Sequence, residues 1–121
     1  MSFSTTGMDP NSVTYFAETD ARNKKVRFGI KAKDRLKHVY VIGKTGMGKS
    51  TLLENMAIQD IQNGNGLAFV DPHGGTADKL LDYVPEHRIK DVLYFAPFVS
   101  ISQGNRFLPA WPGTSFLFLH R

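Results

Sequence analysis

The sequence predicts an α/β fold built around a parallel sheet, and three observations lead to that prediction. A continuous run of β-branched and aromatic residues, HVYVI at 38–42, ends at a glycine-rich loop. Behind the loop, apolar residues recur at helical spacing: Leu53, Met56, Ala57 and Ile61. Two further short apolar runs, LAFVD at 67–71 and VLYFA at 92–96, flank a second helical pattern. Strands that alternate with helices are typical of α/β proteins.

The remaining elements are assigned in chain order. Ahead of the apolar run, short strands over 13–17 and 26–31 enclose a turn and form a small β element. The first long helix starts at Lys49, and we expect it to stop at Gly64, since glycine readily terminates helices. A second helix is expected over 76–84, with Thr76 as its N-cap and Pro85 as its end.

These assignments divide the chain into three regions: a β element with a basic segment over 1–37, a partial core over 38–97, and an atypical tail over 98–121. The tail carries SFLFL without polar alternation and fits no element well. Cysteine is absent, which excludes a disulfide framework and a thiolate metal site. The first residues lack the pattern of a secretory signal, and no apolar stretch approaches the ~20 residues that span a bilayer. We therefore expect a cytoplasmic protein.

The net charge of +4 is unevenly distributed. Residues 1–20 carry a net charge of −3, whereas residues 22–37 hold eight basic residues against Asp34, a net charge of +7. Such a basic block steers polyanions such as nucleic acid toward a surface. It also suits a solvated face or an edge strand that lysines protect from pairing. Charge alone leaves both interpretations open.

The glycine-rich loop GKTGMGKS at 43–50 satisfies the phosphate-loop pattern G-x-x-x-x-G-K-[ST] at every fixed position. Such a loop turns backbone N–H groups inward, and the helix that follows adds its unpaired donors. Gly46 and Gly48 permit positive φ and a close approach of phosphate. Lys49 is the expected contact to the outer phosphates of ATP, and Ser50 the expected Mg²⁺ ligand. The predicted nucleotide site comprises Gly43, Thr45, Gly46, Met47, Gly48, Lys49, Ser50 and Thr51.

A second motif, DPHG, begins at Asp71, where the second apolar run ends. By itself it is a strand-ending turn, since Asp, Pro and Gly are turn residues. Together with the phosphate loop some twenty residues earlier, however, it resembles the HerA–FtsK superfamily of DNA-pumping ATPases. The strongest resemblance is to HerA-like ATPases and to the coupling and assembly ATPases of conjugation and type IV secretion. It covers about residues 26–97.

The resemblance implies a RecA-like core, ring-shaped homo-oligomers and ATP hydrolysis that moves DNA or protein. Carried over by position, Lys49 and Ser50 are the nucleotide and Mg²⁺ contacts. Asp71 joins the nucleotide site, and His73 lies beside it on the catalytic edge of the sheet. DNA and a membrane secretion complex become candidate partners, and the basic block over 22–37 becomes a candidate surface facing DNA or a neighbouring subunit.

The resemblance is incomplete at several positions. Gly75 stands where the family often has an acidic residue, and Ala96 stands where it usually has an acidic or amide residue before proline. No run of four apolar residues followed by Asp-Glu occurs, so the Walker B carboxylates are missing. We therefore expect the N-terminal portion of a longer motor, with a truncated or frame-shifted tail, that binds ATP without hydrolysing it alone.

Two other functions fit the same residues. A small nucleotide-binding sensor or regulatory module needs the phosphate loop but no Walker B pair. A fragment of another phosphate-loop ATPase, such as a transporter ATPase, also carries a GKST-L-L run, although only NGNG separates the helix from the second strand here.

Under each of these functions, strands that lack their neighbouring strands leave unpaired edges. Each unsatisfied buried group costs ~1–3 kcal/mol against a total stability of ~5–15 kcal/mol, so the isolated chain is expected to be marginally stable or prone to aggregation.

Overall fold

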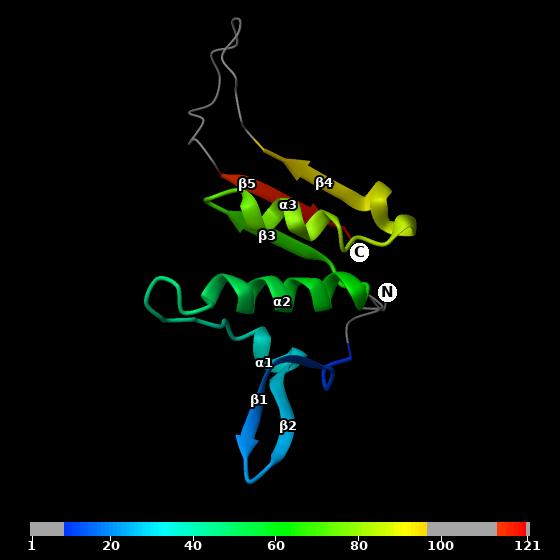
Figure 1. Cartoon of the computed structure of the whole chain (residues 1–121). Helices are drawn as coiled ribbons and strands as arrows, with labels where there is room; N and C mark the ends of the chain where they lie inside the picture. Colours follow the sequence, from blue (N-terminus) through cyan, green and yellow to red (C-terminus); the bar gives the residue numbers. More distant parts are fainter. Residues whose placement is uncertain (1–8, 97–113, 121) are drawn as a thin grey trace, which may run out of the picture. The chain divides into compact units, whose positions relative to one another are not determined.

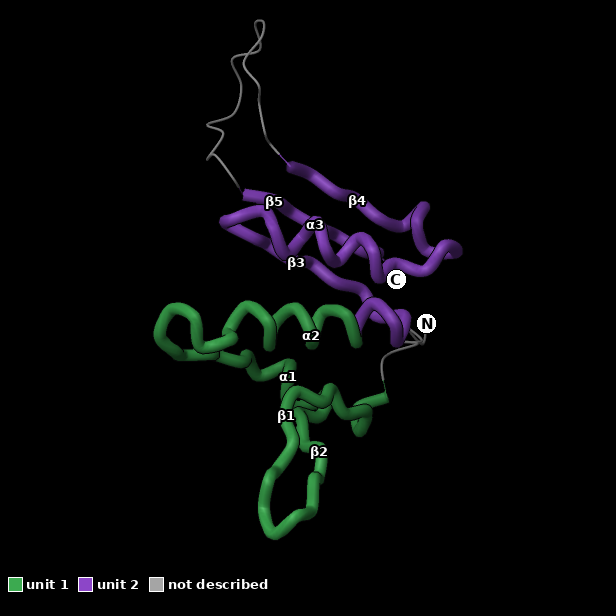
Figure 2. The backbone as a smooth tube through the Cα atoms, in the orientation of Figure 1, with its two compact units in different colours: residues 1–59 green, residues 60–121 purple. Residues whose placement is uncertain are grey.

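Two compact units make up the structure, a computed structural model that describes residues 9–96 and 114–120. The first unit comprises residues 1–59 and the second residues 60–121 (Figure 2). Each unit has its own antiparallel sheet, two-stranded in the first and three-stranded in the second. With its few helices, the protein is a small α/β fold (Figure 1). Among the described residues no helix has the length and apolar character that crossing a bilayer requires.

The first unit begins with a β-hairpin. Strands β1 (Val13–Ala21) and β2 (Lys24–Lys31) pair antiparallel and are joined by only two residues. Arg22 and Asn23 have φ values of 52° and 57°, and positive φ at both central positions is typical of the type I′ turn that matches strand twist. The strands expected at 13–17 and 26–31 therefore form, but the turn is shorter than predicted and both strands extend into it.

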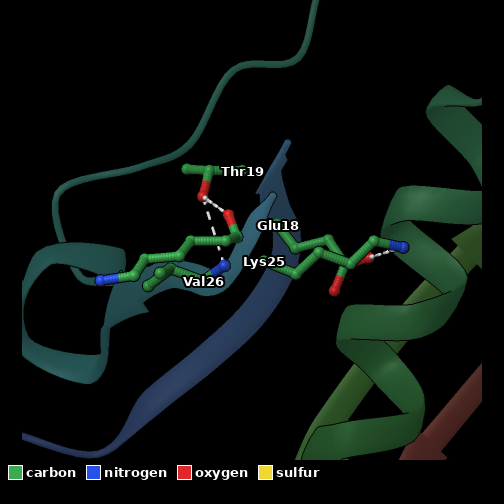
Figure 3. Close-up of polar contacts among 5 residues, drawn as sticks. Glu18, Thr19, Lys25 and Val26 are labelled. Carbon is green, nitrogen blue, oxygen red and sulfur yellow. Dashed lines mark hydrogen bonds and ion pairs between the residues drawn. The ribbon is translucent and has the colours of Figure 1, made fainter. Parts of the chain in front are cut away.

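Side chains on the two faces of this hairpin have different contacts (Figure 3). The Thr19 hydroxyl accepts a hydrogen bond from the Val26 N–H at 3.2 Å and donates one to the Lys24 carbonyl at 3.4 Å. Glu18 and Lys25 form an ion pair at 3.7 Å between exposed side chains, a kind of pair that contributes little stability. Most of the basic block thus lies on exposed strand and turn positions.

A bulge in β1 shapes the base of the hairpin. The register shifts between Tyr15 and Ala17, and the ring of Phe16 meets the ring of Phe28 edge to face, with centroids 5.7 Å apart. A side chain at Gly29 would place its Cβ 1.9 Å from the backbone oxygen of Thr14. Only glycine therefore fits opposite the bulge.

A helical turn, α1 (Ala32–Arg35), follows the hairpin and closes back on the residues before β1. The Ala32 N–H donates to the Ser12 carbonyl at 2.9 Å. The Arg35 guanidinium donates to the Thr14 hydroxyl at 3.0 Å. These contacts fix the exit of the hairpin.

The strand predicted over 38–42 does not form. No strand pairs with these residues in the described structure, and Tyr40 and Ile42 are 88% and 82% exposed. An apolar β-branched run becomes a buried strand only where a neighbouring strand supplies its hydrogen bonds. Both strands of the first unit are already paired with each other.

Helix α2 (Lys49–Gln62) begins and ends where the sequence predicts. Gly64 has a φ of 77°, its N–H donates to Ile61 at 3.2 Å, and the Asn65 N–H donates to the Asp60 carbonyl at 2.9 Å. This is the Schellman arrangement that satisfies the last carbonyls of a helix. Of the residues expected on the buried face, Met56, Ala57 and Ile61 are buried, whereas Leu53 is 44% exposed.

The second unit is built on a sheet with the strand order β3-β5-β4. Its strands are β3 (Leu67–Asp71), β4 (Val92–Phe95) and β5 (Ser115–Leu119). Because β5 is antiparallel to both neighbours, β3 and β4 run in the same direction without pairing. The predicted parallel sheet is therefore wrong for the described residues, in which every ladder is antiparallel, although the strands expected at 67–71 and 92–96 form.

The central strand β5 comes from the tail, for which no element was predicted. Leu117 is completely buried, as are Ala77 and Leu80 of helix α3 (Gly75–Leu81), which covers one face of the sheet (Figure 1). The run SFLFL lacks polar alternation because its other face is apolar as well. The remainder of the tail, 98–113 and 121, lies outside the described residues.

A buried arginine ties the ends of several elements of this unit together. Helix α3 ends at Leu81, earlier than predicted, and Pro85 precedes a 3₁₀ helix, η1 (Glu86–Asp91). From η1 the Arg88 guanidinium donates to three backbone carbonyls at 2.8–3.0 Å. These belong to the last turn of α2, the loop after it, and the residue after β5: Ile61, Asn65 and His120. A cation that binds the last carbonyls of a helix is also stabilised by the negative end of the helix dipole.

Candidate phosphate-binding loop

The glycine-rich loop adopts the backbone conformation that its sequence predicts. Gly46 and Gly48 have φ values of 80° and 85°. A Cβ atom at either position would meet nothing within 4 Å, so backbone conformation, not space, requires glycine here. The Met47 N–H donates to the Lys44 carbonyl at 3.2 Å and closes the turn, while its side chain is 73% exposed.

Lys49, the first residue of α2, folds its side chain back across the loop. Its Nζ donates to the carbonyls of Gly43 at 2.6 Å and Lys44 at 2.8 Å. A Cβ at Gly43 would lie 3.4 Å from the Lys49 side chain, an ordinary van der Waals contact, so this approach alone does not require glycine. Both partners are neutral dipoles, which hold the ammonium over the loop without cancelling its charge. The cation therefore stays able to attract an anion.

The other predicted site residues of this segment lie at the surface. Ser50 and Thr51 occupy the first turn of α2, where backbone N–H groups have no preceding helical carbonyl. The Leu52 N–H, one residue further on, donates to the Gly48 carbonyl at 2.9 Å. Seven predicted contacts are exposed: Gly43, Thr45, Gly46, Met47, Gly48, Ser50 and Thr51. Two positive-φ glycines, a helix start and two lysines, Lys44 and Lys49, thus lie together in an accessible segment.

The predicted protein ligand for Mg²⁺ in this loop is the hydroxyl of Ser50, which is exposed. The described residues hold no group of three or more His, Cys, Asp or Glu side chains that could bind a metal ion by themselves. Mg²⁺ commonly keeps several waters and takes its remaining ligands from substrate phosphates. The residues present therefore fit a cation that arrives with a nucleotide.

Asp71, the other predicted site residue, belongs to the second unit and caps a helix. One carboxylate oxygen accepts hydrogen bonds from the N–H groups of Thr76 at 2.7 Å and Ala77 at 3.2 Å, and the other accepts from His73 at 2.9 Å. The predicted N-cap at Thr76 is wrong. Helix α3 starts at Gly75 after Gly74, whose φ is 82°, and the cap comes from the strand before it.

The pKa of Asp71 lies below its ordinary value of 3.8 as a result of this arrangement. Burial alone would raise the pKa, but hydrogen bonds from the backbone of His73, Thr76, Ala77 and Gly74 outweigh it. The carboxylate is thus ionised and committed to backbone donors. His73 itself is exposed beside it.

A second polar group was not predicted. The Tyr94 hydroxyl donates to an Asp78 carboxylate oxygen, and the Ser115 hydroxyl lies 3.4 Å from the Tyr94 oxygen. The Asp78 bond raises the pKa of Tyr94, so the phenol keeps its proton. Ser115 lies in the tail, where the sequence offered no element, and no local pattern could have placed it beside α3 and β4.

No protein-family model matches this chain, and comparisons with curated proteins and with solved structures find no match.

Proposed function

We propose that residues 43–51 bind the phosphates of ATP with Mg²⁺, as the nucleotide-binding portion of a motor ATPase that moves DNA or couples to secretion. The observation that carries this proposal is the pairing of two positive-φ glycines with Lys49, whose ammonium lies over the loop carbonyls. In the complex, the Lys49 ammonium donates to an outer phosphate oxygen of ATP. The backbone N–H groups of the loop and of the first helical turn bind the other phosphate oxygens.

The motor assignment rests on the resemblance of the phosphate loop and DPHG to the HerA–FtsK superfamily. It implies a longer cytoplasmic protein, which assembles into a ring and acts on DNA or on a secretion substrate. The exposed basic side chains of the hairpin, among them Lys24 and Arg27, offer such a ring a surface for DNA or for a neighbouring subunit.

Titration of the purified chain with a fluorescent ATP analogue in the presence of Mg²⁺ tests nucleotide binding. Lys49→Ala is expected to weaken binding at least tenfold, because the loop loses the ammonium that is expected to contact the outer phosphates. Lys90→Ala, which removes an exposed cation from η1, serves as the matched control and should bind like the wild type. Equal affinity of both variants would show that the loop does not bind the nucleotide.

A regulatory nucleotide-binding module is the second candidate. The missing Asp-Glu pair favours it, since water attack on the γ-phosphate lacks a base within these 121 residues. Both candidates predict binding without turnover by this chain. They separate when the nucleotide sequence downstream is translated in all three frames: a Walker B motif there supports the motor, and its absence leaves the regulatory module.

A further inference from the structure

A cavity of about 490 Å³ lies within the second unit, where β3 and β4 end and β5 begins. Its lining comes from the loop after β3, from α3, and from the ends of β4 and β5: His73, Gly74, Gly75, Asp78, Tyr94, Ala96, Thr114 and Ser115. We call it the Asp78 pocket.

Hydrogen bonds across the Asp78 pocket hold its polar groups in place. Tyr94 has a single proton and gives it to the Asp78 carboxylate. The Ser115 hydroxyl oxygen lies 3.4 Å from the Tyr94 oxygen. An ionised carboxylate has about four acceptor sites, so one bond from Tyr94 leaves Asp78 able to bind further donors.

The charges of the lining residues determine whether the pocket favours an anionic or a cationic ligand. Among the described residues that line the cavity, Asp78 carries a full negative charge and none is a lysine or arginine. The carboxylate of Asp71 adds to the negative field, which reaches the Tyr94 hydroxyl. A phosphate or carboxylate would be repelled, whereas a cation with several N–H donors meets the carboxylate and hydroxyl acceptors.

We propose that the Asp78 pocket binds the primary ammonium or guanidinium group of an alkyl cation, with Asp78 as its counter-ion and the hydroxyls of Tyr94 and Ser115 as additional acceptors. The volume accommodates a side chain of the length of lysine or arginine. The cation comes either from a free amine or from a basic side chain of a peptide. The described lining residues all belong to the second unit, whereas the phosphate loop belongs to the first.

Ethylguanidinium chloride is the probe, titrated into the full chain and followed by NMR, with sodium chloride at equal ionic strength as reference. Saturable shifts are expected at the backbone amides of Gly74, Gly75 and Asp78 and on the Tyr94 ring. Asp78→Asn keeps an acceptor for Tyr94 but removes the charge, and should weaken binding at least tenfold. Asp82→Asn removes an exposed aspartate at the end of the same helix and should change affinity less than twofold.

A second variant keeps the test valid even if Asp78→Asn unfolds. Ala96 lines the pocket and is exposed; Ala96→Lys should supply an internal cation and abolish binding of the probe, whereas Ala96→Gln should not. A blocked Gly-Arg-Gly peptide that binds at least tenfold more tightly than ethylguanidinium indicates a protein partner, and equal affinity indicates a small amine. The proposal is overturned if no cation gives saturable shifts, if Asp78→Asn and Ala96→Lys bind normally, or if inorganic phosphate binds instead.

Discussion

The side chain of Gln59 forms two hydrogen bonds with the backbone of Tyr15. Its Oε1 accepts from the Tyr15 N–H at 2.9 Å, and its Nε2 donates to the Tyr15 carbonyl at 2.6 Å. The primary amide thus pairs with one residue of β1 as a neighbouring strand would. Since Gln59 belongs to the helix that starts with Lys49, this pair links the hairpin to the phosphate loop through a rigid element.

Replacing Gln59 by methionine tests this link. Gln59→Met keeps the length of the side chain and removes both bonds, so the free energy of unfolding should fall by about 1–2 kcal/mol. Exchange of the Tyr15 amide hydrogen should accelerate at least tenfold. Gln62→Met, at an exposed position one turn further on, is the control; identical Tyr15 exchange in the two variants would contradict the role of Gln59.

The loop glycines are expected to be sensitive to any side chain. Gly46→Ala and Gly48→Ala force an L residue into positive φ and should each destabilise the protein by about 1–2 kcal/mol. Gly75→Ala is the control, since its Cβ would meet nothing within 4 Å and its φ is not positive. It should raise stability by about 0.4–1 kcal/mol. Circular dichroism during thermal unfolding measures the stability of all three variants. An unfolding midpoint of Gly48→Ala equal to that of the wild type would contradict the prediction that this position requires glycine.

Asp71 should make the free energy of unfolding depend on pH in the acid range. Its pKa in the folded protein lies below the unfolded value of 3.8, so its contribution is complete above about pH 5 and is lost as the pH falls through the folded pKa. Asp71→Asn keeps a single acceptor oxygen and should cost about 1–2 kcal/mol at pH 7, the usual range for a lost cap. The variant should also lose less stability than the wild type between pH 4 and pH 2.

Urea unfolding at several pH values measures this difference, with Asp82→Asn as control. Asp82 is an exposed aspartate at the C-terminal end of the helix that Asp71 caps, where a negative charge is unfavourable. Its removal should leave stability at pH 7 unchanged or slightly higher. A wild-type acid profile in Asp71→Asn would show that the cap contributes nothing.

The uncovered face of the three-stranded sheet should promote self-association of the isolated chain. Val70, Leu93, Phe95 and Phe118 share this face and are 42–63% exposed. Phe118→Lys should reduce self-association in sedimentation velocity without unfolding the chain. Leu117→Lys, one residue earlier on the buried face, should unfold it, because an unpaired charge would replace a completely buried leucine. A monomeric wild type at high concentration would contradict the prediction.

Local sequence determined the features whose hydrogen bonds lie within a few residues of one another. The turn glycines of the phosphate loop and the span of α2 follow from sequence because positive φ and i→i−4 bonds depend on near neighbours. The same holds for the stop at Gly64, whose Schellman bonds join residues 60–65. The loop glycines and the start of α2 belong to the candidate nucleotide site, so the backbone conformation of that loop could be predicted, whereas nucleotide binding stays a prediction.

Tertiary structure decided which apolar runs became strands and what the polar side chains contact. HVYVI at 38–42 has the stronger β pattern, yet it finds no partner strand in the described structure, whereas SFLFL in the tail lies between β3 and β4. Likewise, only folding brings Arg88 to three distant carbonyls and Ser115 beside Tyr94. A strand and a polar cluster both need partners from remote parts of the chain, so a local pattern cannot specify them, whereas a helix and a turn carry their partners with them.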